Sequence, residues 1–156
     1  MKDDNLLKCI NGSFKELTGQ DLPMPTEHTE LLGWLDESAP YSLLAHNIDP
    51  DPSFIYANSK ALNTFGYSQK EMLNLKSKFS ASEIDREARS QLLKTVKEKG
   101  IATNYNGPRV NKDGSMFTIY NGMVWVVTDE HKNEIGQAAL FWLDSAVPEW
   151  FNVNIP

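Results

Sequence analysis

The chain has 156 residues with 40% hydrophobic, 10% aromatic and 23% charged side chains, a composition typical of one globular domain. Its formal net charge of −6 opposes binding to nucleic acid or to anionic membranes, which requires clustered Lys and Arg. The single cysteine, Cys9, excludes an intramolecular disulfide and any CxxC metal or redox motif. With neither a signal-peptide pattern nor an apolar run of about 18 residues, we expect a cytoplasmic protein without a membrane segment.

The first 38 residues are expected to be helical. Residues 11–18 form a short amphipathic segment that Gly19 can end. Pro23 and Pro25 then predict a linker. A second helix is predicted over residues 26–38, with an apolar stripe made of Leu31, Leu32, Trp34 and Leu35.

Two strands and two short helices are predicted next. The apolar run 41–46 and the segment 54–57 can pair as a hairpin, because the NIDPDP sequence between them favours a turn. Helices are expected over residues 59–65 and 68–75, each beginning at a serine that can cap free backbone N–H groups.

The longest helix is predicted over residues 83–99. Ser80 and Glu83 have the spacing of a capping box, and Gly100 supplies the left-handed end. One buried face is indicated by apolar residues at every fourth position, namely Ile84, Ala88, Leu92 and Val96.

Three antiparallel strands are predicted in the last third, over residues 102–110, 116–128 and 135–143. The turns between them lie at 111–114 and 129–134, where Gly and Asx residues are frequent. Two strands, three helices and three strands in this order predict an α+β fold with one five-stranded antiparallel sheet.

Three stretches resemble PAS domains in order and spacing: YANSKALNTFGYSQKEML (56–73), NKDGSMFTI (111–119) and DEHKNEIG (129–136). The chain is more similar still to the PAS-related MEKHLA domain, which bacteria carry as a stand-alone protein and plants carry at the C-terminus of class III homeodomain–leucine zipper regulators. The residues that carry this resemblance are His46, DPSF (51–54), YAN (56–58), SASE (80–83), Arg86, Glu87, YNGPR (105–109), Phe117, Ile119, VW (124–125) and GQAA (136–139), together with SFKELTGQDL (13–22).

This resemblance implies a PAS-like fold in which helices cover one face of the sheet, with an N-terminal helical extension. We divide the chain into this extension (1–38), the PAS-like domain (39–146) and a C-terminal tail (147–156). The family is proposed to act in sensing or regulatory contacts, without an established ligand or reaction.

PAS domains hold ligands between the inner face of the sheet and the crossing helices, and the resemblance therefore directs attention to side chains on that face. The residues expected to bind a ligand there are His46, Asn58, Tyr105, Arg109, Phe117, Asn121, Met123, Trp125, Gln137 and Phe141. Gln137 and Asn121 could form an amide pair, an arrangement comparable to that of flavin-binding PAS domains.

Three of these residues have two interpretations each. An unbroken strand would bury the Asn121 amide among apolar neighbours, where it needs a partner, whereas a bulge at Asn121 and Gly122 would turn it outward. His46 either satisfies backbone groups at a turn or is held by a carboxylate of residues 47–51. Arg109 either pairs with a carboxylate such as Glu83 or Asp85, or receives an anionic ligand.

The sequence lacks the residues that several PAS cofactors require. Photoactive flavin-binding PAS domains need a Cys in an Asn-Cys-Arg motif, and the corresponding NSKALNTFGYS sequence has none. Haem-binding PAS domains commonly use a His on the long helix, and residues 83–99 have none. The three histidines also lack metal-ligand spacing, and no nucleophile-elbow motif is present, so we expect no metal and no enzymatic activity.

The expected function is that of a sensory or regulatory module that binds a small, largely apolar ligand between sheet and helices. The alternative is a protein-interaction or homodimerisation module with a filled core and no ligand. PAS domains often dimerise through N-terminal helices, a role that suits the apolar stripe Leu31, Leu32, Trp34 and Leu35.

Overall fold

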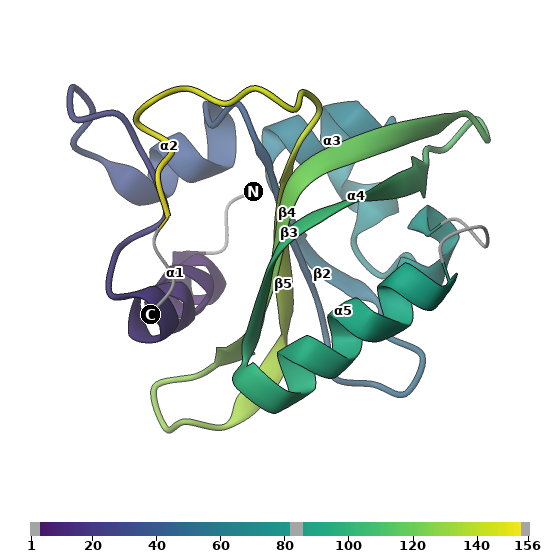
Figure 1. Cartoon of the computed structure of the whole chain (residues 1–156), viewed down its shortest axis with the longest axis horizontal. Coiled ribbons are helices and arrows are strands. Elements are labelled where there is room, and N and C mark those ends of the chain that lie inside the picture. The colour runs from purple at the N-terminus through teal and green to yellow at the C-terminus, as the bar shows by residue number, and fades with distance from the viewer. Residues whose placement is uncertain (1–3, 82–85, 154–156) are drawn as a thin grey trace.

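The computed structural model describes residues 4–81 and 86–153, and it has one central sheet with helices on both faces (Figure 1). The helices are α1 (Asp4–Thr18), α2 (Leu31–Glu37), α3 (Ser59–Phe65), α4 (Gln69–Met72), the 3-10 helix η1 (Ser77–Ser80) and α5 (Arg86–Lys99). The strands are β1 (Ser42–His46), β2 (Phe54–Ala57), β3 (Ile101–Val110), β4 (Met116–Thr128) and β5 (Glu134–Trp142). All neighbouring strands are antiparallel, in the order β2-β1-β5-β4-β3, which confirms the predicted α+β fold.

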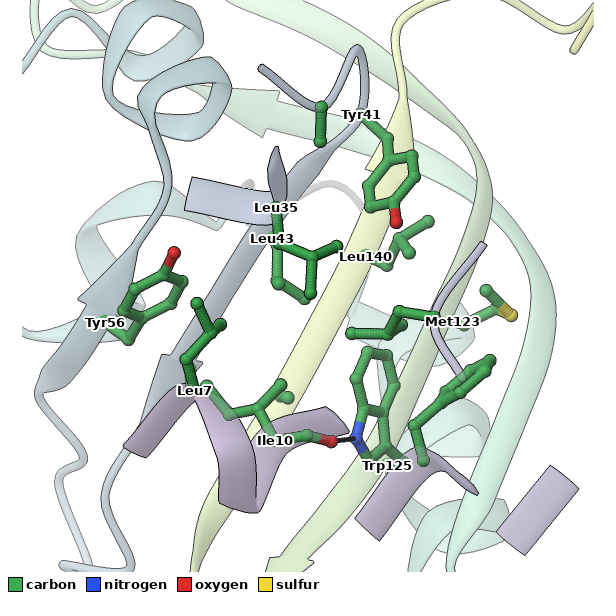
Figure 2. Close-up of a cluster of buried hydrophobic side chains, with 14 of the residues drawn as sticks. Leu7, Ile10, Leu35, Tyr41, Leu43, Tyr56, Met123, Trp125 and Leu140 are labelled. Carbon is green, nitrogen blue, oxygen red and sulfur yellow. Dashed lines mark hydrogen bonds between the residues drawn. The ribbon is translucent and has the colours of Figure 1, made fainter. Parts of the chain in front are cut away.

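Figure 1 shows α1 and α2 on one side of the sheet and α3, α4 and α5 on the other. The α1 side holds the larger apolar cluster, and part of it is drawn in Figure 2. Leu7, Ile10 and Phe14 are fully buried there, and the indole Nε1 of Trp125 donates a 3.1 Å hydrogen bond to the Ile10 carbonyl. The N-terminal segment is therefore a layer of the core, and α1 begins at Asp4 rather than near residue 11 because its apolar face extends that far.

Helix α2 is shorter than the predicted helix over residues 26–38. Glu30 caps it, since a side-chain oxygen of Glu30 accepts a 2.6 Å hydrogen bond from the Gly33 N–H. Trp34 and Leu35 are buried in the core of their own chain, and Leu31 and Leu32 pack against the same cluster. Trp34 and Leu35 are therefore covered by the chain itself, and a homodimer contact through this stripe stays a prediction.

The helices on the other face have the expected places but not always the expected caps. Asn58, not Ser59, caps α3, whereas Ser68 caps α4 as predicted and also forms a capping box with Glu71 that was not expected. The predicted helix over residues 68–75 ends at Met72.

The long helix α5 buries one face, as predicted, along part of its length. Leu92 and Val96 are buried as expected, but Ala88 is exposed. Glu83 and Ile84 lie outside the described residues, so the predicted capping box with Ser80 stays a prediction. Ser80 itself donates a 2.7 Å hydrogen bond from Oγ to the Ser77 carbonyl.

A bulge interrupts β4 in the middle of the sheet. The register with β5 shifts between Tyr120 and Met123, and Asn121 has a φ of 53°. The Asn121 amide donates a 3.1 Å hydrogen bond to the Ser145 carbonyl. This confirms the second interpretation of Asn121, and the extra residue reverses the side-chain alternation for the rest of β4.

Within the described ranges, none of the helices is both long and apolar enough to cross a membrane.

Candidate functional site

A partly open cavity of about 90 Å³ lies between the α5 face of the sheet and the segments η1 and α5. Its wall is mainly apolar and includes Leu44, Phe54, Phe65, Leu92, Ile119 and Phe141. The polar side chains in the wall belong to His46, Ser77, Ser80, Arg89, Tyr105, Arg109 and Gln137. An apolar cavity with a few polar groups is the usual form of a small-molecule site.

His46 and Gln137 lie side by side in this wall. They are directly opposite each other on β1 and β5, so their Cβ atoms are about 5 Å apart. Their side chains share the face of Leu44 and Ala139, which belong to the cluster under α3 and α5. Gly136 allows β5 to approach β1 here, because a Cβ atom at that position would lie 2.2 Å from the His46 carbonyl oxygen.

The imidazole of His46 is held by the backbone. Its Nδ1 lies 2.8 Å from the carbonyl oxygen of Asn47. Since a carbonyl only accepts hydrogen bonds, Nδ1 carries the proton, and Nε2 is the acceptor in the neutral ring. Of the two interpretations of His46, the structure therefore supports a contact with a backbone group at the turn, and it leaves Nε2 without a hydrogen-bond partner among the described residues.

The side-chain amide of Gln137 also has no hydrogen-bond partner in the described part of the chain, although the residue is half-buried. It can both donate through Nε2 and accept through Oε1. The amide atoms of Gln137 are not fully buried, so in this partly open cavity they are accessible to water or to a ligand.

Arg109 lies at the other end of the cavity wall. Its guanidinium donates hydrogen bonds to the Tyr105 hydroxyl, at 3.2 Å, and to the Pro108 carbonyl, at 2.7 Å. It also stands over the Tyr105 ring, 5.2 Å from the ring centroid. Glu83 and Asp85, its expected carboxylate partners, lie outside the described residues, so the choice between a carboxylate and an anionic ligand stays open.

Three of the expected ligand-binding residues, Asn121, Trp125 and Phe117, lie outside the cavity wall, and a fourth, Met123, only borders it. Asn121 turns away at the bulge, and Trp125 packs under α1 on the opposite face, because the bulge moves it there. Met123 borders the cavity but also belongs to the α1-side cluster (Figure 2). Phe117 packs against Phe65, with 5.3 Å between the two ring centroids, and does not line the cavity.

Asn58 is buried, and its amide makes only structural contacts. Oδ1 accepts hydrogen bonds from the N–H groups of Leu43 and Ala61, and Nδ2 donates to the carbonyls of Leu35 and Tyr41. All four bonds join elements of this chain, so its expected ligand contact is not supported by its position.

Ser77 and Arg89 line the cavity and were not expected there. Ser77 belongs to η1 and Arg89 to α5, two segments that cross the sheet. In these segments the sequence pattern does not indicate which residue faces the cavity. Leu44 could have been found, because it shares the β1 alternation with His46.

The strongest upward pKa shifts occur on the opposite side of the sheet from the cavity. Burial raises the pKa of the Tyr41 hydroxyl. Burial, followed by the hydrogen bond to Asp36 and its charge, raises the pKa of Tyr56. The Tyr41 hydroxyl bonds to the Pro23 carbonyl and the Tyr56 hydroxyl to Asp36 in α2, and neither tyrosine lines the cavity. Among the residues described, no group of three His, Cys, Asp or Glu side chains could hold a metal ion.

Comparison with solved structures identifies PAS and light-oxygen-voltage domains. The chain is similar to the PAS domain of a protein from Colwellia psychrerythraea, with a TM-score of 0.62 and 17% identity, covering 72% of this chain and 92% of that one. It is also similar to a light-oxygen-voltage domain described with a flavin analogue, with a TM-score of 0.59 and 22% identity over 80% of this chain and 90% of that one. At this identity the similarity shows the fold alone.

No curated protein sequence matches the chain. The family model of the MEKHLA domain matches residues 4–143. This match begins in α1 and ends just after β5, so it includes the N-terminal layer as well as the sheet. The chain therefore belongs to the MEKHLA domain family, which has a PAS-like fold.

Proposed function

We propose that the chain is a sensory or regulatory module that binds a small, largely apolar ligand in the cavity between the sheet and the segments η1 and α5. The observation that carries this proposal is the composition of the cavity wall. The wall is mainly apolar and also holds His46 and Gln137, whose Nε2 and side-chain amide have no hydrogen-bond partner among the described residues. Such a wall favours a ligand that is mostly apolar and has one polar edge.

The size of the cavity limits the ligand. Sites for drug-sized molecules have volumes of at least about 300 Å³, whereas this cavity has about 90 Å³. One similar light-oxygen-voltage domain was described with a flavin analogue, but a flavin exceeds the space in the present cavity. We therefore infer a much smaller ligand, and we assign the chain a binding role without a reaction of its own.

Ala139 offers a way to close the cavity. It lies in the cavity wall between Leu44 and Val124 on the neighbouring strands. Ala139→Leu adds three carbon atoms to this wall. Ala146→Leu, at an exposed position in the C-terminal segment, is the matched control.

The test is an NMR screen of molecules with fewer than about eight heavy atoms. A compound that shifts the resonances of cavity residues in the parent protein and in Ala146→Leu, but not in Ala139→Leu, supports the proposal. A screen in which no compound gives this pattern contradicts it and favours the alternative, an interaction module with no ligand.

A further inference from the structure

We infer that the ligand presents a neutral amide edge, an N–H group beside a C=O group, to His46 and Gln137. This inference rests on the proposed function, and it specifies the chemistry of the ligand. It is based on the two polar groups that lie together at one end of the cavity and on the direction in which each can form hydrogen bonds.

His46 defines one half of the edge. Because Nδ1 donates to the Asn47 carbonyl, Nε2 of the neutral ring can only accept a hydrogen bond. A ligand atom at this position must therefore be a donor. The bond to Asn47 also fixes the ring plane, so the acceptor has a defined direction before any ligand arrives.

Gln137 defines the other half. Its amide carries both a donor and an acceptor, and it is directly opposite His46 on the neighbouring strand. The two side chains together thus offer one acceptor, from His46, and a donor with an adjacent acceptor, from Gln137. A primary amide or a urea matches this set, since its N–H can reach Nε2 while its C=O accepts from the Gln137 Nε2–H.

The size of the cavity agrees with a small group of this kind. A cavity of about 150 Å³ accepts benzene, which has six heavy atoms. At the same proportion, the present volume of about 90 Å³ holds about four heavy atoms, the size of acetamide or urea. A longer molecule would place only its amide end here and extend through the open side.

A neutral amide is favoured over a carboxylate at this end of the cavity. A carboxylate in a largely apolar wall needs a paired charge to offset its lost hydration. The two arginines of the wall, Arg89 and Arg109, come from α5 and β3 and not from the strand pair that carries His46 and Gln137. A carboxylate would also face the lone pair of His46 Nε2, unless the imidazole became protonated. The amide forms both hydrogen bonds with the two side chains in their neutral forms.

Acetamide, acetone and acetate are similar in size and differ in the atoms that this inference concerns. Acetone lacks the N–H group, and acetate carries a charge in place of it. We propose titrations of the ¹⁵N-labelled protein with each probe. Acetamide should bind about tenfold more tightly than either of the other two, and it alone should shift the Nε2 resonance of His46.

The variants separate a direct contact from a general loss of structure. His46→Leu should weaken acetamide binding about tenfold and leave acetone binding nearly unchanged, because only acetamide has an N–H group for Nε2. Gln137→Met should weaken the binding of both probes, because both carry the C=O that accepts from Gln137. His131→Leu and Gln91→Met, at exposed positions outside the cavity, are the matched controls. If His46→Leu does not fold, the Nε2 resonance of the parent protein still decides the question.

Several outcomes would overturn the inference. Equal binding of acetone and acetamide, abolished by Ala139→Leu, would remove the amide edge but leave the proposed ligand cavity intact. Tighter binding of acetate would assign the cavity to an anion instead. If none of the three probes shifts a cavity resonance, the amide inference fails, and the wider screen alone decides whether any ligand binds.

Discussion

Asn58→Ala should destabilise the fold strongly without acting on a ligand. The Asn58 side chain is buried and makes four hydrogen bonds of 2.9 to 3.1 Å, which connect α2, β1 and the first turn of α3. A net value of about 1 kcal/mol for each bond gives a loss of about 4 kcal/mol. For a domain of this length, that loss lowers the thermal midpoint by about 8 to 16 °C.

Circular dichroism can measure this change during heating and in urea. Asn63→Ala is the matched control, because Asn63 is exposed on the same helix and should change the midpoint little. A decrease of less than about 3 °C for Asn58→Ala would refute the reasoning. A stable variant with altered ligand binding would instead return Asn58 to the cavity, as the resemblance to PAS domains first suggested.

Three further changes test other contacts. Gly136→Ala should lower stability by at least about 2 kcal/mol in urea unfolding, because the new Cβ would overlap the His46 carbonyl. Trp125→Phe should lower it by about 3 kcal/mol, since it removes the indole hydrogen bond to α1 and leaves a void; an unchanged urea midpoint would contradict this. The hydrogen bond from Lys112 lowers the pKa of Glu71 from 4.5 to about 2, so this contact stabilises the protein above pH 4.5 and is lost as the pH falls toward 2. In urea unfolding at pH 5 and pH 3, Lys112→Met should therefore lose less stability on acidification than the parent protein, and 0.5 M salt should reduce the difference.

The strands could be predicted closely because their alternation and turns are local features. β2 and β4 have the expected bounds, and the antiparallel hairpin of β1 and β2 follows from the two prolines between them. The cap of α4 could be predicted from its residue type, because a cap bonds within its own first turn, but the same criterion chose Ser59 in place of Asn58 for α3.

Contacts between distant segments were predicted less well. The apolar stripe of α1 consists of Leu7, Ile10 and Phe14. It enters the core only because the sheet covers it, and one of its partners there, Trp125, lies more than a hundred residues later in the chain. Similarly, Asn58 is a polar residue beside a predicted strand, and only the positions of α2 and β1 show that its amide is fully used within the chain.

The main error at the candidate site has one local cause. Regular alternation along β4 would direct Phe117, Ile119, Met123 and Trp125 to the same face. The bulge at Asn121 instead divides them, so that Ile119 lines the cavity while Trp125 packs under α1. The Asn-Gly pair was recognised as a possible bulge, but a pattern alone does not decide between a bulge and a buried amide.

Substitutions at Asn121 can test this account, because the two geometries predict opposite orders of stability. At a φ of 53°, a β-branched side chain is strained by roughly 1 to 2 kcal/mol, and the hydrogen bond to the Ser145 carbonyl is lost as well. Asn121→Val should therefore cost about 2 to 3 kcal/mol in urea unfolding, whereas Asn121→Gly should stay within about 1 kcal/mol of the parent protein, since glycine adopts this backbone freely. In a regular strand with the side chain facing the core, valine would be the more stable variant and glycine the less stable one. Such a result would show that β4 is unbroken and would return Asn121, with Trp125, to the cavity face.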